Sequence, residues 1–163
     1  MIVYHGSTEI IRNPDVVHSK KYLDFGRGFY ITTFENQAKK WAVRKEMRQE
    51  KKAIVNIYEL SEKWDDYRVL SFEKENEKWL DFVCGCRKGQ PLNEEYDIII
   101  GNVADDDVFK TVDMYFRGLW DKEKVLDELR YYKMNNQICI VNQETLNRLI
   151  TFKRAYEVEN NGR

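Results

Sequence analysis

The sequence predicts an α+β fold for this chain of 163 residues. Short runs with β-propensity are mixed with segments of helical periodicity, and their order contains no regular βαβ repeat, so a parallel doubly wound sheet is not expected. The length matches one domain, and the hydrophobic fraction of 42% with only two prolines is typical of a folded globular chain. We expect one domain over residues 1–158 and a frayed C-terminus over 159–163.

The chain is expected to begin with a strand and a glycine-rich loop. Residues 2–5 have the composition of a short strand, which should end at Gly6-Ser7. After a loop, the closely spaced glycines of Gly26-Arg27-Gly28 lead into a β-prone stretch over residues 29–32. The glycine loop therefore lies between the first strand and the helix that follows.

That first helix is expected near residues 34–51. Thr33 is a candidate N-cap, because its hydroxyl can accept a hydrogen bond from a free amide of the first turn. Ala38, Trp41 and Ala42 fall on one face of the helix, with charged residues around the rest. This pattern predicts a helix that packs through small and aromatic side chains.

The remaining elements follow from periodicity and length. Residues 53–60 alternate well enough for a half-buried strand, and Asp121 is a candidate N-cap for a later helix. The other segments with strand character cover residues 96–100, 137–141 and 152–158. The segments with helix character cover residues 72–86, 106–117, 122–133 and 143–149.

Composition predicts a cytoplasmic protein that is not inserted in a membrane. No run approaches the roughly 18 apolar residues of a spanning helix, and the N-terminus lacks the pattern of a signal peptide. Cys84, Cys86 and Cys139 have no metal-ligand spacing. We expect three reduced, mostly buried thiols and no metal site.

Positive charge is concentrated at the N-terminal end, although the net charge of −1 excludes a globally basic nucleic-acid binder. Residues 1–52 contain 11 Lys/Arg and 6 Asp/Glu, a balance of +5, and part of this excess lies in residues 39–45. Two interpretations fit this excess. One is a solvated helix face, and the other is a surface that attracts a phosphate-rich ligand or a nucleic acid.

Three segments carry a resemblance to a known family. Tyr4-His5-Gly6-Ser7 resembles the Tyr-His-Gly-Ser/Thr motif of the diphtheria-toxin and poly(ADP-ribose) polymerase branch of the ADP-ribosyltransferases. Gly26-Arg27-Gly28-Phe29-Tyr30-Ile31-Thr32 is similar to the glycine-rich approach to the pocket tyrosine of that branch. Ala38-Lys39-Lys40-Trp41-Ala42 resembles the helix behind the pocket. Their order and spacing agree with the family.

Nearly the whole chain also resembles an uncharacterised bacterial domain family that is grouped with these transferases. The segments that carry this second resemblance are Trp79-Leu80-Asp81-Phe82-Val83 and Ile99-Ile100-Gly101-Asn102-Val103-Ala104-Asp105-Asp106. The resemblance implies a split antiparallel β-sheet core flanked by helices. It implies no particular acceptor.

The resemblance implies that NAD is the bound substrate and assigns roles to several residues. His5 would bond a ribose hydroxyl, and the Gly6 backbone with the Ser7 side chain would meet the nicotinamide carboxamide. Tyr30 would lay its ring against the nicotinamide. Arg27 either reaches the pyrophosphate by a bidentate contact or is a solvated loop residue. The site would also include Tyr4, Gly28 and Trp41.

One residue departs from the family pattern. Active members carry a glutamate early on a late core strand, and the segment that resembles this strand, residues 136–141, has Gln137 there. A neutral amide accepts a hydrogen bond from a hydroxyl but cannot act as a general base. Glu144 is an alternative carboxylate. Asp105 and Asp106 either cap the helix that follows them or supply the negative charge that Gln137 lacks.

The resemblance therefore implies a mono-ADP-ribosyltransferase that modifies an intracellular protein or nucleic acid. Small members of such groups resemble toxins of toxin–antitoxin or phage-defence modules, which implies an antitoxin-like partner. Two other classes stay open. One is a catalytically impaired module that binds NAD or ADP-ribose, and the other is a plain nucleic-acid-binding domain, whose binding would depend steeply on salt.

Overall fold

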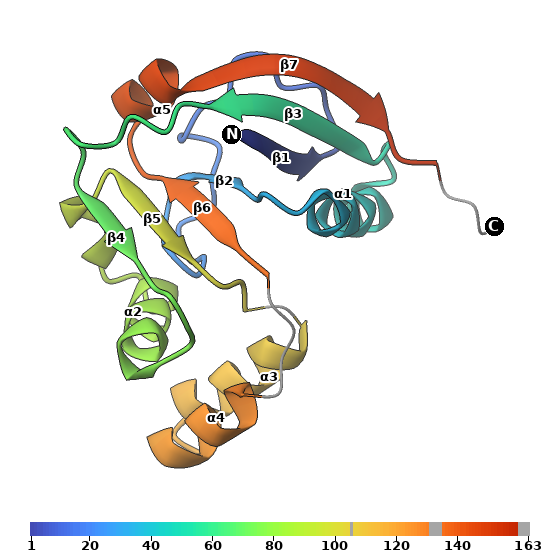
Figure 1. The fold of residues 1–163 in the computed structure, drawn as a ribbon. Helices are drawn as coiled ribbons and strands as arrows, with labels where there is room; N and C mark the ends of the chain where they lie inside the picture. The colour runs from blue at the N-terminus through green and yellow to red at the C-terminus, as the bar shows by residue number, and fades with distance from the viewer. Residues whose placement is uncertain (105, 131–134, 160–163) are drawn as a thin grey trace.

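The computed structural model describes residues 1–104, 106–130 and 135–159, and within them it is a mixed α+β structure, as the sequence predicts (Figure 1). The strands are β1 (Ile2–Ser7), β2 (Phe29–Ile31), β3 (Ile54–Leu60), β4 (Val69–Ser71), β5 (Ile98–Gly101), β6 (Gln137–Ile140) and β7 (Ile150–Glu157). The α-helices are α1 (Glu35–Gln49), α2 (Glu77–Arg87), α3 (Asp106–Phe116), α4 (Lys122–Leu129) and α5 (Gln143–Leu149). A short 3₁₀ helix, η1, covers Leu92–Glu95.

The strands form two sheets that meet at β1 and β2. One sheet has the order β1-β3-β7, and the other has the order β2-β6-β5-β4. All pairs are antiparallel except β4 with β5, which is parallel and departs from the purely antiparallel arrangement that we expected. Tyr4 and Thr32 join the sheets through two backbone hydrogen bonds of 2.8 and 3.0 Å. This bridge brings the first strand motif beside the glycine loop.

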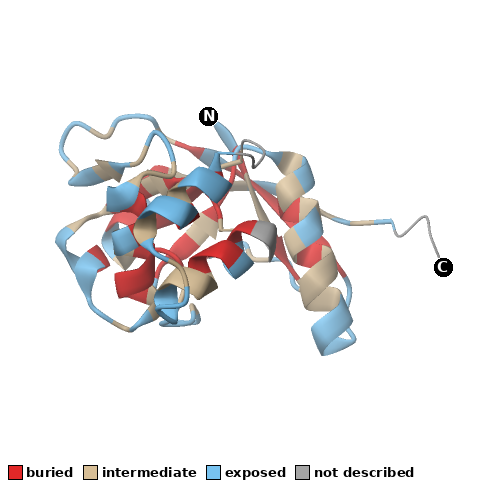
Figure 2. Ribbon diagram, turned by 90° about the horizontal axis from the view of Figure 1, so that it is seen from below, coloured by how far each residue is buried: buried red, intermediate tan, exposed pale blue. Residues whose placement is uncertain are grey.

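Three apolar clusters fill the molecule. The first lies between α1 and the three-stranded sheet, and includes Ala38, Ala42 and Val55. The second lies between the sheets, and the third lies between the four-stranded sheet and helices α2, α3 and α4. In Figure 2 the buried residues of the helices lie on their inward sides. The small alanines let α1 approach β1 closely, which fixes one wall of the site described below.

The first two expected helices begin later than predicted. Phe34, not Thr33, is the N-cap residue of α1, and its apolar side chain cannot make a capping bond. The Thr33 hydroxyl accepts from Asn136 instead. Helix α2 begins at Glu77 rather than at residue 72, because the Asn76 side chain caps it by accepting from the Trp79 amide.

Three strands also differ from the prediction. Strand β4 was not predicted from the sequence. Strand β3 is buried except at Glu59, because α1 covers one of its faces and the second sheet covers the other, so it is not the half-buried strand that we expected. Strand β7 starts at Ile150, two residues before the predicted start.

Other expectations agree closely with the structure. Helix α5 covers the predicted residues 143–149, and Asp121 caps α4 through the Lys124 amide. Helix α4 ends at Leu129, whereas the prediction extended to residue 133, and residues 131–134 lie outside the described chain. Of the predicted frayed end, residues 160–163 also lie outside it. Within the described residues, the model has no helix of the length and apolar character required for a membrane span.

Candidate active site

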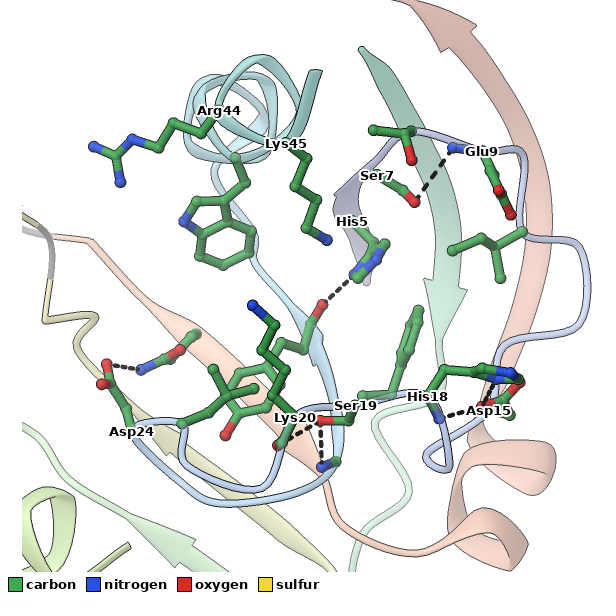
Figure 3. A pocket seen from close by; sticks show the side chains of 18 of the residues that line it. His5, Ser7, Glu9, Asp15, His18, Ser19, Lys20, Asp24, Arg44 and Lys45 are labelled. Carbon is green, nitrogen blue, oxygen red and sulfur yellow. Dashed lines mark hydrogen bonds and ion pairs between the residues drawn. The ribbon is translucent and has the colours of Figure 1, made fainter. Parts of the chain in front are cut away.

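A cavity of about 1180 Å³ opens between β1, β2, α1 and the loop that joins the two strands (Figure 3). Small-molecule sites usually have volumes of about 300–1,000 Å³, so this cavity is large enough for a dinucleotide. Asn56 and Tyr58 on β3 hold the loop against the sheet. Asn56 accepts from the Ile11 amide at 2.8 Å and donates to the Glu9 carbonyl at 3.0 Å, and the Tyr58 hydroxyl donates to the Ile11 carbonyl.

Six residues that the sequence analysis named line this one cavity. They come from β1, the glycine loop, β2, α1 and β6, and they are His5, Ser7, Gly28, Tyr30, Trp41 and Gln137. Tyr4, Gly6 and Arg27 do not belong to this lining. Segments that are far apart in the sequence therefore meet here because the two sheets join at the Tyr4–Thr32 bridge.

His5 is held as a neutral imidazole with a defined tautomer. Its Nδ1 lies 2.6 Å from the Tyr30 carbonyl oxygen, and because a carbonyl only accepts, Nδ1 carries the proton and Nε2 is an acceptor. The ring stacks on Phe29 with centroids 4.6 Å apart. Burial, and next the positive charge of Lys45, lower the pKa of His5 from 6.5 to about 3. A neutral ring with one acceptor nitrogen suits a hydroxyl donor.

This lowered pKa predicts a pH-dependent part of the stability. The unfolded chain binds a proton at His5 near pH 6.5, while the folded protein stays neutral there down to about pH 3. The contribution of His5 is therefore fully present above pH 6.5 and is lost as the pH falls toward 3, at up to about 1.4 kcal/mol per pH unit. We expect His5→Gln to reduce the dependence of the free energy of unfolding on pH, measured by urea denaturation between about pH 7 and pH 4.5.

Val3→Ala is the matched control for this measurement. It truncates a buried side chain of the same strand but removes no titratable group, so it should lower the free energy of unfolding equally at each pH. If His5→Gln keeps the full wild-type dependence on pH, the neutral buried state of His5 is wrong.

Tyr30 joins the glycine loop to the cavity wall. Its hydroxyl donates to the Gly26 carbonyl and accepts from the Phe25 amide at 3.1 Å. Burial is the main reason that the pKa of Tyr30 lies well above its usual value of 10. The hydroxyl is therefore a structural anchor for the loop, and the side chain also packs against the apolar cluster under the four-stranded sheet.

Gln137 forms part of a buried polar cluster with Asp24 and Arg87. The Gln137 amide nitrogen donates to Asp24 Oδ2 at 3.0 Å, and Ala104 N donates to the same oxygen at 3.0 Å. The Arg87 guanidinium binds Asp24 Oδ1, with Nε at 2.9 Å. The side chains of Asp24 and Arg87 are only 10% and 14% exposed. A carboxylate that is paired with Arg87 thus lies directly behind the Gln137 amide.

Cations outnumber anions on the cavity wall. Six Lys/Arg side chains and three Asp/Glu side chains contribute to the lining: Arg12, Lys20, Arg44, Lys45, Arg48 and Arg87 against Glu9, Asp15 and Asp24. Five of the six cations belong to the basic N-terminal region. The wall therefore favours an anionic ligand, and Arg44 and Lys45 of the basic run 39–45 contribute to it. Lys39 of the same run instead lies near Glu35.

Gly6 and Gly28 are required by packing. A Cβ atom on Gly6 would lie 2.2 Å from the Ala38 carbonyl oxygen of α1. A Cβ atom on Gly28 would lie 2.4 Å from Cys139 Sγ. The close approach of α1 to β1 therefore explains Gly6 without a ligand. Tyr4 packs beside the cluster under α1, and Arg27 is exposed, with its carbonyl accepting from Asn93.

The other candidate carboxylates are not placed in the cavity. Glu144 is exposed and pairs with Arg148 in α5. Asp105 lies outside the described residues, and Asp106 begins α3, where only its backbone is described. Cys84, Cys86 and Cys139 are free and buried, as predicted. In the described part of the chain, no group of three or more His, Cys, Asp or Glu side chains has the arrangement of a metal site.

Sequence reasoning missed Asp24 and did not single out Lys20. Asp24 lies two residues before the glycine pair, in a loop whose course the sequence does not define. Asp24 and Gln137 are 113 positions apart in the sequence, so no local pattern predicts that they are in contact. The one available signal was an acidic residue directly preceding Phe25-Gly26 in a chain segment that is otherwise basic.

A family model matches most of the chain. The chain belongs to the family described as "Protein of unknown function (DUF3990)", whose model covers residues 1–152. A search of curated proteins gives no match. The matched range includes β1 to β6, α1 to α5 and every residue of the cavity wall named above, and of β7 it includes only residues 150–152.

Proposed function

We propose that this protein binds NAD in the cavity between its two sheets and transfers ADP-ribose from it to an intracellular macromolecule. One observation carries the proposal: His5 and Tyr30, on strands of different sheets, line one cavity and are joined by the 2.6 Å contact from His5 Nδ1 to the Tyr30 carbonyl. The same two residues carry the resemblance to the ADP-ribosyltransferases. The mixed α+β structure with two joined sheets is compatible with the split core of that family.

The cavity offers a complementary group for each part of NAD. The unprotonated Nε2 of His5 accepts from a ribose hydroxyl, and the Tyr30 ring supplies a π-rich wall for the nicotinamide. The excess of Lys and Arg side chains favours the pyrophosphate. Ser7 lies beside His5 on the same strand and can bond the carboxamide. NAD is bound here without a Rossmann fold.

The proposed reaction breaks the bond between the nicotinamide nitrogen and ribose C1′. The bonding electron pair leaves with the nitrogen, which turns the pyridinium into neutral nicotinamide, and C1′ acquires oxocarbenium character. A nucleophile of the acceptor, or water, bonds to C1′ and releases its proton to solvent. The protein contributes orientation of the two sugars and stabilisation of the developing positive charge.

Gln137 presents a polarised amide oxygen at this point, because Asp24 lies behind its amide nitrogen. Asp24 accepts from the Gln137 amide nitrogen, which polarises the amide and places more negative charge on its oxygen. That oxygen can accept from the 2′-hydroxyl of the reacting ribose, although it cannot remove a proton. The charge of Asp24 is balanced by Arg87, so Asp24 orients and polarises Gln137 and does not supply the free negative charge that was one expectation for Asp105 or Asp106. We expect transfer of single units or slow hydrolysis, not polymer synthesis.

The experiment is incubation with labelled NAD and a cell lysate, followed by separate nuclease and protease digestion of the product. We expect nicotinamide release and label in one macromolecular fraction, and about 100-fold or greater loss of both in His5→Ala. Glu144→Gln is the control, because Glu144 is exposed and does not line the cavity. Absence of both label and nicotinamide release in the wild type would refute the transferase.

A second candidate function is a module that senses NAD or ADP-ribose without turnover. The neutral amide of Gln137 favours it, because no formal charge faces the cation. NAD would then raise the melting temperature while no nicotinamide is released on long incubation. An antitoxin-like partner, implied by the resemblance, belongs to the transferase proposal and would be sought by copurification with the wild-type protein.

A further inference from the structure

Two lysine side chains converge in the cavity from distant parts of the chain. Lys45 lies on α1, and Lys20 lies on the loop between β1 and β2. Figure 3 shows both side chains pointing into the same space, with His5 beside it. The Lys45 ammonium is largely buried and donates to the Gly6 carbonyl oxygen at 2.7 Å. Burial, and next the charge of Lys20, lower the pKa of Lys45.

The carboxylates of the cavity wall are bonded to other groups. Glu9 pairs with Lys51 at 3.2 Å, and Asp15 bonds His18 at 2.8 Å. Asp24 binds Arg87. Among the residues that the structure describes, no ion pair involves Lys20 or Lys45. Two neighbouring ammonium groups without a carboxylate partner repel each other, and a bound anion would relieve that repulsion.

We propose that Lys45 and Lys20 form a subsite for a phosphate ester, with the pyrophosphate of the dinucleotide as its first expected occupant. This identity of the occupant rests on the proposed function. The shared chemistry is a phosphate group, which a phosphodiester of a nucleic-acid acceptor also supplies. An ammonium group is a suitable point charge for phosphate, and its three donors can bond more than one oxygen.

Lys45 donates to the Gly6 carbonyl, which the family resemblance places beside the nicotinamide carboxamide. Tyr4 and Gly6 are two residues apart on β1, so their carbonyls face the same edge of the strand. The Tyr4 carbonyl bonds Thr32 at this edge, and the Gly6 carbonyl is bonded to Lys45. A carboxamide that donates to the Gly6 carbonyl would compete with or share the bond from the Lys45 ammonium, and a pyrophosphate would offer that ammonium a second partner. Binding of the nicotinamide carboxamide and binding of the pyrophosphate would therefore influence each other through Lys45.

The test uses the full chain with three probes: inorganic pyrophosphate, ADP-ribose and a short single-stranded oligonucleotide. Binding is measured by titration calorimetry at fixed salt. We expect Lys45→Met and Lys20→Met each to weaken the affinity for pyrophosphate and ADP-ribose about 10-fold or more. Lys45→Arg should keep most of the affinity. Lys40→Met is the matched control, because Lys40 is exposed on α1 and does not line the cavity.

The outcomes separate the sources of phosphate. Competition between ADP-ribose and pyrophosphate supports the dinucleotide as occupant, whereas competition by the oligonucleotide alone supports a nucleic-acid acceptor. Unchanged affinity for all three probes in both methionine variants overturns the subsite. Lys20→Met lies in an exposed loop, so it keeps the test open if Lys45→Met does not fold.

The subsite and the proposed function can fail independently. If the wild type cleaves NAD, and both methionine variants cleave it with unchanged KM and kcat and bind all three probes as the wild type does, the subsite is wrong and the transferase stands. If pyrophosphate binding depends on the two lysines but the wild type neither binds nor cleaves NAD, the subsite stands and the transferase is wrong.

Discussion

Replacement of Asp24 by asparagine should lower the free energy of unfolding by about 3–5 kcal/mol, because it leaves the Arg87 guanidinium buried without a countercharge. The two side chains are 10% and 14% exposed, and four donors converge on the Asp24 carboxylate: Arg87 through two nitrogens, the Ala104 amide and Gln137. Urea denaturation at neutral pH measures the change.

Two further variants identify the cause of this loss. Asp24→Asn combined with Arg87→Met removes both charges and should recover much of the stability, because a buried pair that is deleted together costs less than one that is broken. Asp127→Asn is the surface control, since its partner Arg130 is exposed and such pairs contribute less than about 1 kcal/mol. If Asp24→Asn costs no more than Asp127→Asn, Asp24 does not organise this cluster.

Introduction of the glutamate that the ADP-ribosyltransferase resemblance implies at position 137 should not raise the rate of NAD cleavage while Asp24 is present. In Gln137→Glu the new carboxylate would replace an amide whose nitrogen lies 3.0 Å from Asp24 Oδ2. The single Arg87 guanidinium can balance only one of the two carboxylates, so ionisation of the second is opposed. We expect one of them to hold a proton, so the reacting ribose meets no additional negative charge. We expect NAD cleavage by Gln137→Glu at or below the wild-type rate.

The double variant separates this effect from a failure of the transferase proposal. Asp24→Asn with Gln137→Glu removes the neighbouring carboxylate, and we expect about 10-fold to 100-fold faster nicotinamide release than in Gln137→Glu alone, since each 1.36 kcal/mol of transition-state stabilisation is worth tenfold. The rate is expressed per folded molecule, with the folded fraction determined by circular dichroism. A single Gln137→Glu variant that is already faster than the double variant contradicts the inhibitory role of Asp24.

Helix caps and short periodic runs in the sequence correctly predicted the elements that depend only on neighbouring residues. Asp121 and the α5 segment were found because a cap or a short periodic run is sufficient to define them. Strand β4 was not found, because Val69–Ser71 is three residues long and becomes a strand only by pairing with β5. Helix α2 was placed too early because charged residues before Asn76 are compatible with a helix, and only the cap shows where the helix starts.

The candidate residues that the structure brings together are those that stand in continuous motifs. His5 and Tyr30 stand in such motifs and line the same cavity. Asp24 and Arg87 belong to a loop and a helix end that meet only in the folded chain, so no spacing rule connects them with Gln137. For Gly6, the sequence motif suggested a role that the packing of the fold already explains. Its position suggested ligand approach, while the structure shows that the α1 backbone already excludes a side chain there.

The two hydrogen bonds that anchor the Tyr30 hydroxyl to Gly26 and Phe25 have a consequence for recognition. They restrict rotation of the side chain when the chain folds, so the associated rotamer entropy is not lost again when a ligand arrives. The aromatic face is consequently preorganised, and it cannot swing aside to accommodate a bulky non-planar group. In the proposed NAD site, a flat heterocycle would find a ready stacking partner, and planarity would be a criterion of selection.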